Sequence, residues 1–498
     1  MSYSTEDVSK IERVVQLARS SGQTQWLANV VEVDSVDPLR CYSCCESDDR
    51  FVWDHRESRE QFVAWGRVDE IESAGSERFH DVEAWAAEVG SRLHWLGKER
   101  PRTAPLFVGG FGFEEDGTSA AEWKAFPSAR FVLPATIAEA GEGKARFTLL
   151  ARVECGASQD AVEFELSERL AQANAFMSSP TTVPDEAEEL DFDRWKSLGW
   201  PAGPEYRVRS DRAHSVFASQ INHALEGIEA GQLDKVVLAR SLRVDHDGRL
   251  DIPGFLRRLS VLYPSCTLVA MGRGDDTFLA ATPETLIRVQ NDRIETAALA
   301  GSAPRGRTPK EDEELARSLE SSAKERAEHA HVVEALREVL GPLCLELEVK
   351  EEPGLRRLFG IQHLETPISG RLRPMEVDRT GDAGRNPLLR LVAALHPTPA
   401  VGGVPRDLAR EWLRRYEGLD RGWYASPVGW LDAAGGGDFC VALRSALIQG
   451  GGTKSDRDSG SRAWLFAGAG IVAGSQPKQE IVETRVKLRA LLAPLTEI

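Results

Sequence analysis

The stretch LDKVVLARSL (residues 233–242) sets a lysine, Lys235, at the start of an apolar, β-branched run. Such a run is typical of a buried β-strand. A lysine beside a strand is in most proteins a solvated side chain, so this position alone predicts no chemistry. The segments around it decide whether the amine faces water or a ligand.

These segments predict a helix before the stretch and antiparallel strands after it. Helical spacing of apolar residues spans 215–232, with a glycine near the end. Short polar turns rather than helices join the runs that follow, which favours antiparallel pairing. The predicted strands are CTLVAMG (266–272), DTFLAAT (276–282), TLIRVQ (285–290) and RIETAALAG (293–301).

The rest of the chain is mixed α and β without an internal repeat. Residues 1 to about 180 alternate strand-like and helix-like runs. SSPTTVPDEAEELD (178–191) has the composition of a surface connection, and GGGTKSDRDSGS (450–461) that of a flexible loop. A long helix is predicted over 309–340, and a last helix from Pro477 towards Leu492.

Composition and charge argue against several classes of protein. The 498 residues carry a net charge of −17 and no block of basic residues, so nucleic acid is not an expected partner. No long apolar run or export signal is visible, so we expect a cytoplasmic protein without a membrane contact. Cys41, Cys44 and Cys45 resemble half of a zinc site, but no second pair follows at finger-like spacing.

Two predicted helices place carboxylates where apolar residues would be expected. Glu328 lies one turn before Val332 on an apolar stripe, and Glu325 lies three residues earlier. In the last helix Glu480, Glu483 and Lys487 share one side. Each pattern alone could be an amphipathic boundary or a surface ion pair. Two carboxylate pairs together would suit Mg²⁺, which prefers oxygen ligands.

A glycine pattern near the C-terminus imitates a dinucleotide-binding fingerprint. Gly468, Gly470 and Ala473 form GxGxxA after a strand-like run. The fingerprint needs a further strand with an acidic residue about twenty positions on, and the chain reaches Ile498 after one helix. These glycines can still let backbone N–H groups approach an anionic ligand.

Taken together, these pieces resemble the chorismate-utilising enzymes, and most closely the isochorismate synthases of the menaquinone and siderophore pathways. The resemblance covers about 205–498, and PLFVGGFGF (105–113) is similar to a strand that the family carries early in the chain. The segments that carry it, in family order, are KVVLAR (235–240), ATPETL (281–286), ALAGSAPRG (298–306), KERAEHAHVV (324–333), GIQHL (360–364), LHPTPAVGG (395–403), RGWYASPVGW (421–430), ALR (442–444), FAGAGIVAGS (466–475) and EIVETRVK (480–487).

The resemblance implies an α+β fold of two packed, largely antiparallel sheets with helices outside. It also implies two parts: an N-terminal α+β region (1–195) fused structurally to the rest, and a chorismate-binding catalytic region (205–498).

The family reaction adds water at C2 of chorismate while the C4 hydroxyl departs, so it needs a base, an acid and neutralisation of the ring carboxylate. By resemblance Lys235 is the base and Glu284 the general acid. Glu328 and Glu483 carry over as Mg²⁺ ligands, with Glu325 and Glu480 as nearby carboxylates.

Other positions match residues that hold the substrate. Arg444, Tyr424 and the backbone around Gly468 and Gly470 match groups at the enolpyruvyl carboxylate, and Lys487 matches a residue that faces the metal-bound end. The remaining expected contacts are Gly301, Ser302, His363 and Ala400.

Lys235 favours water over ammonia as nucleophile, because the ammonia-using relatives typically have no lysine there. Salicylate synthases keep the lysine but resemble HPTxT where this chain has Ala400, which favours stopping at isochorismate. We expect menaquinone supply rather than siderophore supply, and a monomer. The alternatives are salicylate formation, a catalytically inactive binding protein, and a dinucleotide-dependent oxidoreductase.

Overall fold

The computed structural model describes residues 4–56, 58–97, 105–117, 120–141, 144–178, 205–374, 387–450 and 460–496. Apart from their end residues, the predicted surface connection at 178–191 and the predicted loop at 450–461 lie outside these ranges.

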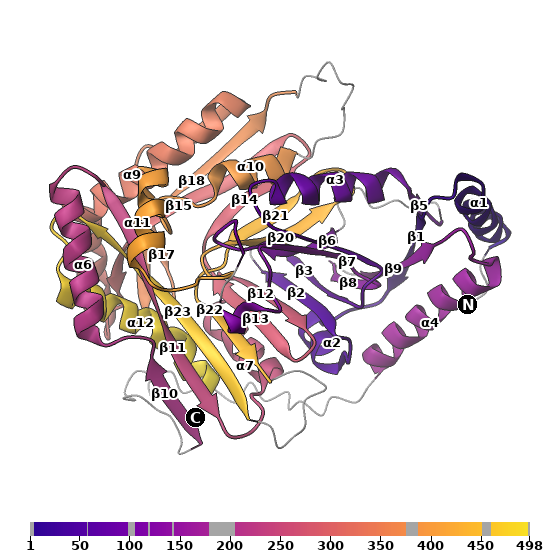
Figure 1. The fold of residues 1–498 in the computed structure, drawn as a ribbon, viewed down its shortest axis with the longest axis horizontal. Helices are drawn as coiled ribbons and strands as arrows, with labels where there is room; N and C mark the ends of the chain where they lie inside the picture. Colours follow the sequence, from indigo (N-terminus) through magenta and orange to yellow (C-terminus); the bar gives the residue numbers. More distant parts are fainter. Residues whose placement is uncertain are drawn as a thin grey trace.

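Two sheets form the centre of the molecule (Figure 1). In the first sheet the strands lie in the order β10 (Tyr206–Ser210), β11 (Lys235–His246), β23 (Ser461–Val472), β22 (Ser445–Gln449), β13 (Asp276–Thr282), β12 (Thr267–Arg273), β2 (Asp49–His55), β3 (Glu60–Trp65), β8 (Thr136–Ala140), β9 (Ala145–Val153), β1 (Gln25–Val33) and β5 (Leu93–Trp95), with β19 (Gly403–Val404) beside β11. In the second the order is β16 (Cys344–Val349), β18 (Ile361–Leu372), β15 (Arg293–Pro304), β14 (Thr285–Gln290), β21 (Gly437–Val441), β20 (Pro427–Asp432), β6 (Pro105–Phe111), β7 (Ala129–Leu133) and β4 (Asp69–Ser73), with β17 (Gly354–Arg357) beside β18.

The sheets are largely antiparallel, as in the predicted fold class. Among the described strands the β1–β5 ladder is parallel and the other ladders are antiparallel. Strands from early and late parts of the chain pair directly, β2 with β12 in one sheet and β6 with β20 in the other. The early residues therefore share both sheets with the later ones.

Helices cover the sheets, and α6 and α4 lie at opposite sides of the view in Figure 1. The helices of the described residues are α1 (Thr5–Ser21), α2 (Pro38–Cys44), α3 (Arg78–Ser91), α4 (Gln159–Ser178), α6 (His214–Glu229), α7 (Ile252–Leu262), α8 (Pro309–Ser321), α9 (Ala323–Leu340), α10 (Pro387–Leu395), α11 (Arg406–Tyr416) and α12 (Pro477–Thr496), with short 3₁₀ turns at Ala121–Trp123 and Gly341–Leu343.

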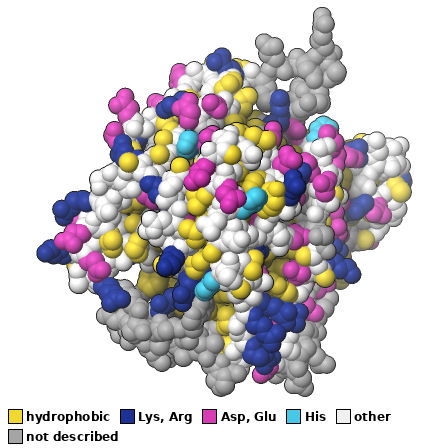
Figure 2. All heavy atoms as spheres, turned by 60° about the vertical axis from the view of Figure 1, so that its left-hand side comes forward, with side chains coloured by type: hydrophobic (Ala, Val, Ile, Leu, Met, Phe, Trp, Pro, Cys, Tyr) yellow, Lys and Arg dark blue, Asp and Glu magenta, His cyan; other side chains and the backbone are white. Residues whose placement is uncertain are grey.

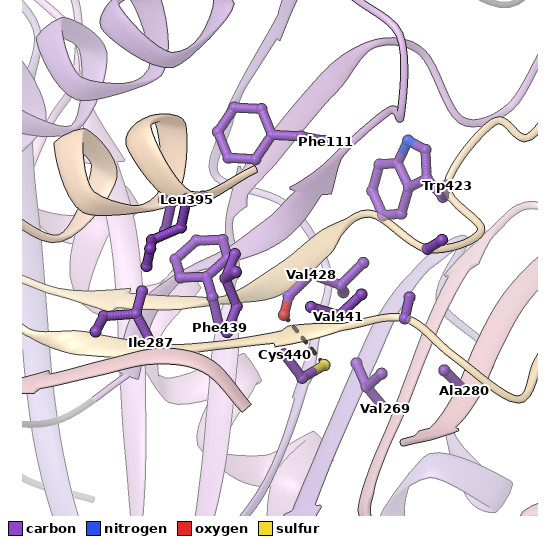
Figure 3. Close-up of a cluster of buried hydrophobic side chains, with 14 of the residues drawn as sticks. Phe111, Val269, Ala280, Ile287, Leu395, Trp423, Val428, Phe439, Cys440 and Val441 are labelled. Carbon is purple, nitrogen blue, oxygen red and sulfur yellow. Dashed lines mark hydrogen bonds between the residues drawn. The ribbon is translucent and has the colours of Figure 1, made fainter. Parts of the chain in front are cut away.

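A large apolar core joins the two sheets. Figure 3 shows part of it, where Phe111, Phe439 and Val441 of the second sheet belong to one buried cluster with Val269 of the first. The Phe62 and Trp430 rings, one from each sheet, meet edge to face at 6.0 Å. A second core lies on the other face of the first sheet, beneath α1, α4, α7 and α12. Each face of that sheet is thus buried, which explains its apolar strands.

The predicted long helix over 309–340 is wrong, because two helices occupy this segment. The helix is interrupted at Ser322, whose backbone is extended, with a φ of −70° and a ψ of 114°. The Ser322 side chain accepts a hydrogen bond from the Glu325 N–H and so caps the start of α9. This cap fixes the first turn of α9, which carries Glu325, and Glu328 follows in the second turn.

The last helix extends beyond the predicted end at Leu492, to Thr496, with Pro494 inside it. A proline lacks the N–H that would bond to the carbonyl four residues earlier. That carbonyl belongs to Ala490. It accepts a hydrogen bond of 3.0 Å from the hydroxyl of Tyr263, the residue that follows α7. The leucines Leu491 and Leu495 are buried and hold the final turn against the core.

The chain crosses from one sheet to the other between β13 and β14. These two strands were predicted as neighbours in one antiparallel series, but β13 belongs to the first sheet and β14 to the second. The crossing residues are Pro283 and Glu284. Thr282 donates to the Val441 carbonyl at 2.6 Å, and the Val441 N–H donates to the Glu284 carbonyl at 3.0 Å. Glu284 therefore lies between the layers.

Charged side chains of both signs are interspersed over the face in Figure 2. The seven cysteines are free, and Cys41 and Cys45 are buried on or beside α2. No helix within the described ranges combines the length and apolar composition needed to cross a membrane.

Candidate active site

Lys235 is buried rather than solvated. It begins β11, lies opposite Val472 of β23, and its side chain is 1% exposed. Its Nζ lies 2.8 Å from Glu328 Oε1 on α9. A Cβ on Gly470 of β23 would stand 2.4 Å from that oxygen and 3.1 Å from Lys235 Cε. Only glycine leaves room for this ion pair.

Glu284 is the second buried group that can transfer a proton. Its carboxylate accepts a hydrogen bond of 3.4 Å from the Thr398 hydroxyl. Burial raises the pKa of Glu284 to about 7, against the opposing influence of Lys235, Thr398, Arg444 and Lys487. The side chain is therefore partly protonated near neutral pH, as a proton donor must be.

One cavity of about 80 Å³ gathers most of the predicted site residues. Lys235 is not itself a lining residue but pairs with one, Glu328; Glu325 accepts a hydrogen bond from the backbone of another, Ser302; and Glu480 is buried outside the lining. The predicted residues that line this active-site cavity are Glu284, Gly301, Ser302, Glu328, His363, Ala400, Tyr424, Arg444, Gly468, Gly470, Glu483 and Lys487.

A neutral histidine and a buried arginine form one wall. His363 Nδ1 lies 3.0 Å from Ser302 Oγ, and its Nε2 lies 3.0 Å from Arg444 Nη2. Burial, followed by the charges of Arg444 and Lys487, holds the pKa of His363 well below its ordinary value. Neutral His363 accepts from Arg444. The Nε and Nη1 atoms of Arg444 are buried without a hydrogen-bond partner among the described residues, so they remain to bind an anion.

Tyr424 also lines the cavity, and its ring stacks on Phe466 at 5.3 Å. Burial raises the pKa of Tyr424, so its hydroxyl stays protonated as a hydrogen-bond donor. A Cβ on Gly468 would approach this hydroxyl to 3.0 Å. Gly468 therefore leaves the hydroxyl accessible, while its carbonyl accepts from Lys487 Nζ at 2.9 Å.

The carboxylates of α9 and α12 are close enough to repel one another. Burial, followed by the charge of Glu328, raises the pKa of Glu325, and burial followed by Glu483 raises that of Glu480. Lys324 lies between them, 3.6 Å from Glu325 and 3.3 Å from Glu480. Within the described residues no three acidic, histidine or cysteine side chains converge as a metal site would require.

The carboxylate set nevertheless has the chemistry that Mg²⁺ prefers. Oxygen ligands suit this ion, and Glu328 and Glu483 both line the cavity. Each is now paired with a lysine, Glu328 with Lys235 and Glu483 with Lys487 at 2.7 Å. Burial acts to raise the pKa of Glu328, but Lys235 holds it below its ordinary value. Glu328 is thus available as an anionic ligand.

The model of the family described as chorismate binding enzyme matches residues 10–496. The chain belongs to the chorismate-binding enzyme family. The match extends from α1 into α12 and so includes both sheets and every residue of the cavity.

Two curated members of the family align over nearly the whole chain. The salicylate biosynthesis isochorismate synthase of Pseudomonas aeruginosa is 36% identical over 98% of this chain and 94% of its own length. The isochorismate synthase MenF of Bacillus subtilis is 31% identical over 93% of this chain and 92% of its own.

Solved structures in the family share the fold. The menaquinone-specific isochorismate synthase MenF of Escherichia coli matches with a TM-score of 0.72 over 98% of this chain and all of its own, at 24% identity. Anthranilate synthase component I of Streptococcus pneumoniae matches with a TM-score of 0.65 over 87% of this chain and 92% of its own, at 22% identity. Proteins named for different reactions therefore share this architecture, and the site residues must decide the chemistry.

Several supporting residues were missed in the sequence although they lie in family segments. Thr398 holds Glu284, and Lys324 joins the two acidic helices. Arg421 forms a buried ion pair with Glu417 at 2.7 Å. Arg421 also donates to the carbonyls of Val237 and Val401, at 2.7 and 2.8 Å.

The last two contacts fix cavity walls, because both valines line the cavity. The signal available in the sequence was position within the segments HPTP, KERAEH and RGWY. Such a segment identifies a neighbourhood but not the partner of each side chain.

Proposed function

We propose that this protein is an isochorismate synthase, an isomerase that converts chorismate to isochorismate by adding water at C2 as the C4 hydroxyl departs. The names of the full-length relatives support this activity. The observation that carries it is one cavity lined by a buried protonatable acid, Glu284, and by Arg444 with two free donors, next to a buried amine, Lys235, that is paired with the lining residue Glu328.

Lys235 takes a proton from the attacking water, and Glu284 gives one to the departing oxygen. The Lys235 amine is held by Glu328 at 2.8 Å, so this contact has to open before the amine can reach the attacking water. Glu284 is partly protonated near neutral pH because its pKa is about 7. One group thus gains the proton and the other loses it, and the enzyme returns to its starting state by exchange between them.

Arg444 and Tyr424 hold the enolpyruvyl carboxylate. The free Nε and Nη1 donors of Arg444 suit two carboxylate oxygens, and the Tyr424 hydroxyl adds a third donor. Ser302 and His363 line the ring side of the cavity. This arrangement orients the ring between the base and the acid.

Glu328 and Glu483 are the proposed ligands of Mg²⁺, with Glu325 and Glu480 as supporting carboxylates. When bound there, the ion neutralises the ring carboxylate of the substrate. Isothermal titration of the protein with MgCl₂ tests this assignment without turnover. Glu483→Gln should weaken the binding clearly, while Glu338→Gln, at an exposed position of α9, should not. Equal binding by all three proteins would place the ion elsewhere.

Product analysis tests the activity itself. The purified protein is incubated with chorismate and Mg²⁺, with and without ammonium, and the products are separated by chromatography. We expect isochorismate in both cases, and its loss in Lys235→Gln with an unchanged circular dichroism spectrum. Binding of chorismate without any product would instead favour an inactive binding protein. Near-normal turnover by Lys235→Gln would refute the base assignment.

Salicylate synthesis is the second candidate, since one full-length relative is named for salicylate biosynthesis. Ala400 lines the cavity. Its methyl group cannot form a hydrogen bond, and it stands in this chain's HPTPA segment, where the corresponding segment of salicylate synthases resembles HPTxT. We infer that the reaction stops at isochorismate. Ala400→Thr should shift the product ratio towards other chorismate products, and an unchanged profile would show that this position does not select the product.

We further propose that the product supplies menaquinone synthesis and that the enzyme works as a monomer with Mg²⁺. The full-length alignment with the MenF of B. subtilis supports the first point. Loss of menaquinone in a deletion strain, measured by lipid chromatography, tests the pathway. Sedimentation velocity tests the oligomeric state.

A further inference from the structure

A second cavity, of about 470 Å³, lies on the other side of the active-site wall. It is formed by residues 305–307 before α8, residues 358–361 at the start of β18, and the C-terminal half of α12. Arg444 and Lys487 line both this outer cavity and the active-site cavity. The two spaces therefore share these side chains as a common wall.

The charge of the outer cavity is opposite to that of the protein. No aspartate or glutamate is among the described residues that line it, although the whole chain carries −17. Arg305 is held by Asp312 through two hydrogen bonds of 2.7 Å, and Lys487 is paired with Glu483 at 2.7 Å, so much of the charge of these two residues is offset. The cationic lining residues are Arg305, Arg307, Arg444, Lys487 and Arg489.

These cations are graded from solvent to interior. Arg307 and Arg489 are exposed at the rim, whereas Arg444 is 7% exposed at the shared wall. Two guanidinium nitrogens of Arg444 are buried and have no partner within the described residues. A buried cationic donor without a partner is costly, and an anion arriving from either cavity would relieve that cost.

The remaining wall of the outer cavity is apolar. Phe359, Val486 and Ala493 line it beside the arginines. A ligand that suits this lining is small, carries carboxylates and has an apolar ring. Chorismate, the proposed substrate, has this chemistry.

We propose that the outer cavity is an antechamber that captures the substrate dianion from solution and delivers it past Arg444 and Lys487 to the active site. This inference rests on the proposed function. A protein of charge −17 repels a dianion at long range, and a concave cationic patch on an accessible face reverses the sign locally. The rim arginines thus set the rate of capture, while Lys235 and Glu284 set the chemistry.

The test compares two double variants of equal net charge. Arg307→Gln/Arg489→Gln removes two charges from the rim of the outer cavity. Arg13→Gln/Arg19→Gln removes two charges from exposed positions of α1, in the early part of the chain. The association rate of chorismate is measured for each by stopped-flow protein fluorescence at several salt concentrations, and kcat is measured separately.

We expect the rim variant to bind chorismate about tenfold more slowly at low salt, with the difference shrinking towards none near about 1 M salt, and with kcat unchanged. The α1 variant should match the wild type. An equal slowing of both variants would show that net charge and not the outer cavity governs capture. A normal rate in the rim variant would overturn the proposal as well.

These outcomes are separable from failure of the proposed function. If the wild-type protein binds chorismate but forms no isochorismate, the activity is wrong, while the association rates still decide the antechamber. If it does not bind chorismate, both are wrong.

Discussion

At the scale of single residues, the environment of Glu284 predicts how the activity depends on pH. Burial raises its pKa to about 7, so the carboxyl group is protonated below that pH and ionised above it. A proton donor works only while protonated, so its contribution is complete below its pKa and is lost as pH rises through it. We expect kcat to fall about tenfold per pH unit above about pH 7 on this account.

Rate measurements from pH 5.5 to 9 check this expectation. Glu284→Gln is the control, because an amide cannot donate a catalytic proton. Its remaining activity should be low, and its kcat should not fall above pH 7 as that of the wild type does. A descent that persists in this variant would belong to another group.

At the scale of elements, the cap between α8 and α9 links helix stability to the acidic cluster. Ser322 accepts from the Glu325 N–H, and a Glu325 side-chain oxygen accepts from the Ser302 N–H at 3.0 Å. Ser322→Ala should lower the free energy of unfolding by about 1 kcal/mol and weaken Mg²⁺ binding, because the first turn of α9 loosens. Urea unfolding and magnesium titration measure the two effects.

Thr308 offers a matched control for this prediction. It caps α8 through the Glu311 N–H in the same way, but the helix that it starts carries none of the cluster. Thr308→Ala should cost similar stability and leave Mg²⁺ binding unchanged. If both variants weakened binding equally, the loss would reflect general destabilisation.

The proline in α12 makes a second prediction at this scale. Tyr263→Phe removes the donor that serves the Ala490 carbonyl, which Pro494 cannot serve. We expect a loss of about 1 kcal/mol in the free energy of unfolding, because a partly buried carbonyl loses its hydrogen-bond donor. In a Pro494→Ala background, which restores the helical N–H, the same substitution should cost less. Equal costs in both backgrounds would contradict this account.

Elements differ in how far the sequence could predict them. The β11, β12 and β13 strands follow from local apolar runs; β12 and β13 agree with their runs to within one residue, whereas β11 continues beyond its run to His246. The break at Ser322 had a local signal, since SAKE (322–325) has the S-x-x-E pattern of a capping box, but helical spacing continues on both sides and concealed it. The change of sheet after β13 has no such signal, because periodicity does not state which sheet a strand joins.

At the scale of the whole molecule, the early and late parts of the chain share hydrogen-bonded strands. β2 pairs with β12 and β6 pairs with β20, so neither sheet is complete without residues from both parts. We expect a single cooperative unfolding transition in scanning calorimetry, with equal calorimetric and van 't Hoff enthalpies. Two resolved transitions would instead indicate regions that unfold independently.

The active site also belongs to this scale, which limits what its residues reveal before folding. Family segments identified Lys235, Glu284, Glu328 and Arg444 as candidates. Their pairing could not be predicted, since the Lys235–Glu328 contact joins residues far apart in the chain and depends on how α9 packs on β15. The lysine partner of Glu328 emerges only from that packing, whereas the Glu483–Lys487 pair follows from i,i+4 spacing within one helix.

The passage of the chain from β13 to β14 has a mechanical consequence. Glu284 lies where hydrogen bonds between Thr282, Val441 and Glu284 itself join the two sheets. A shift of one sheet relative to the other would therefore displace its carboxyl group. The position of the Glu284 carboxyl group therefore depends on how rigidly the two sheets pack against each other. For this reason, mild core substitutions remote from the cavity should lower kcat before they measurably lower the free energy of unfolding.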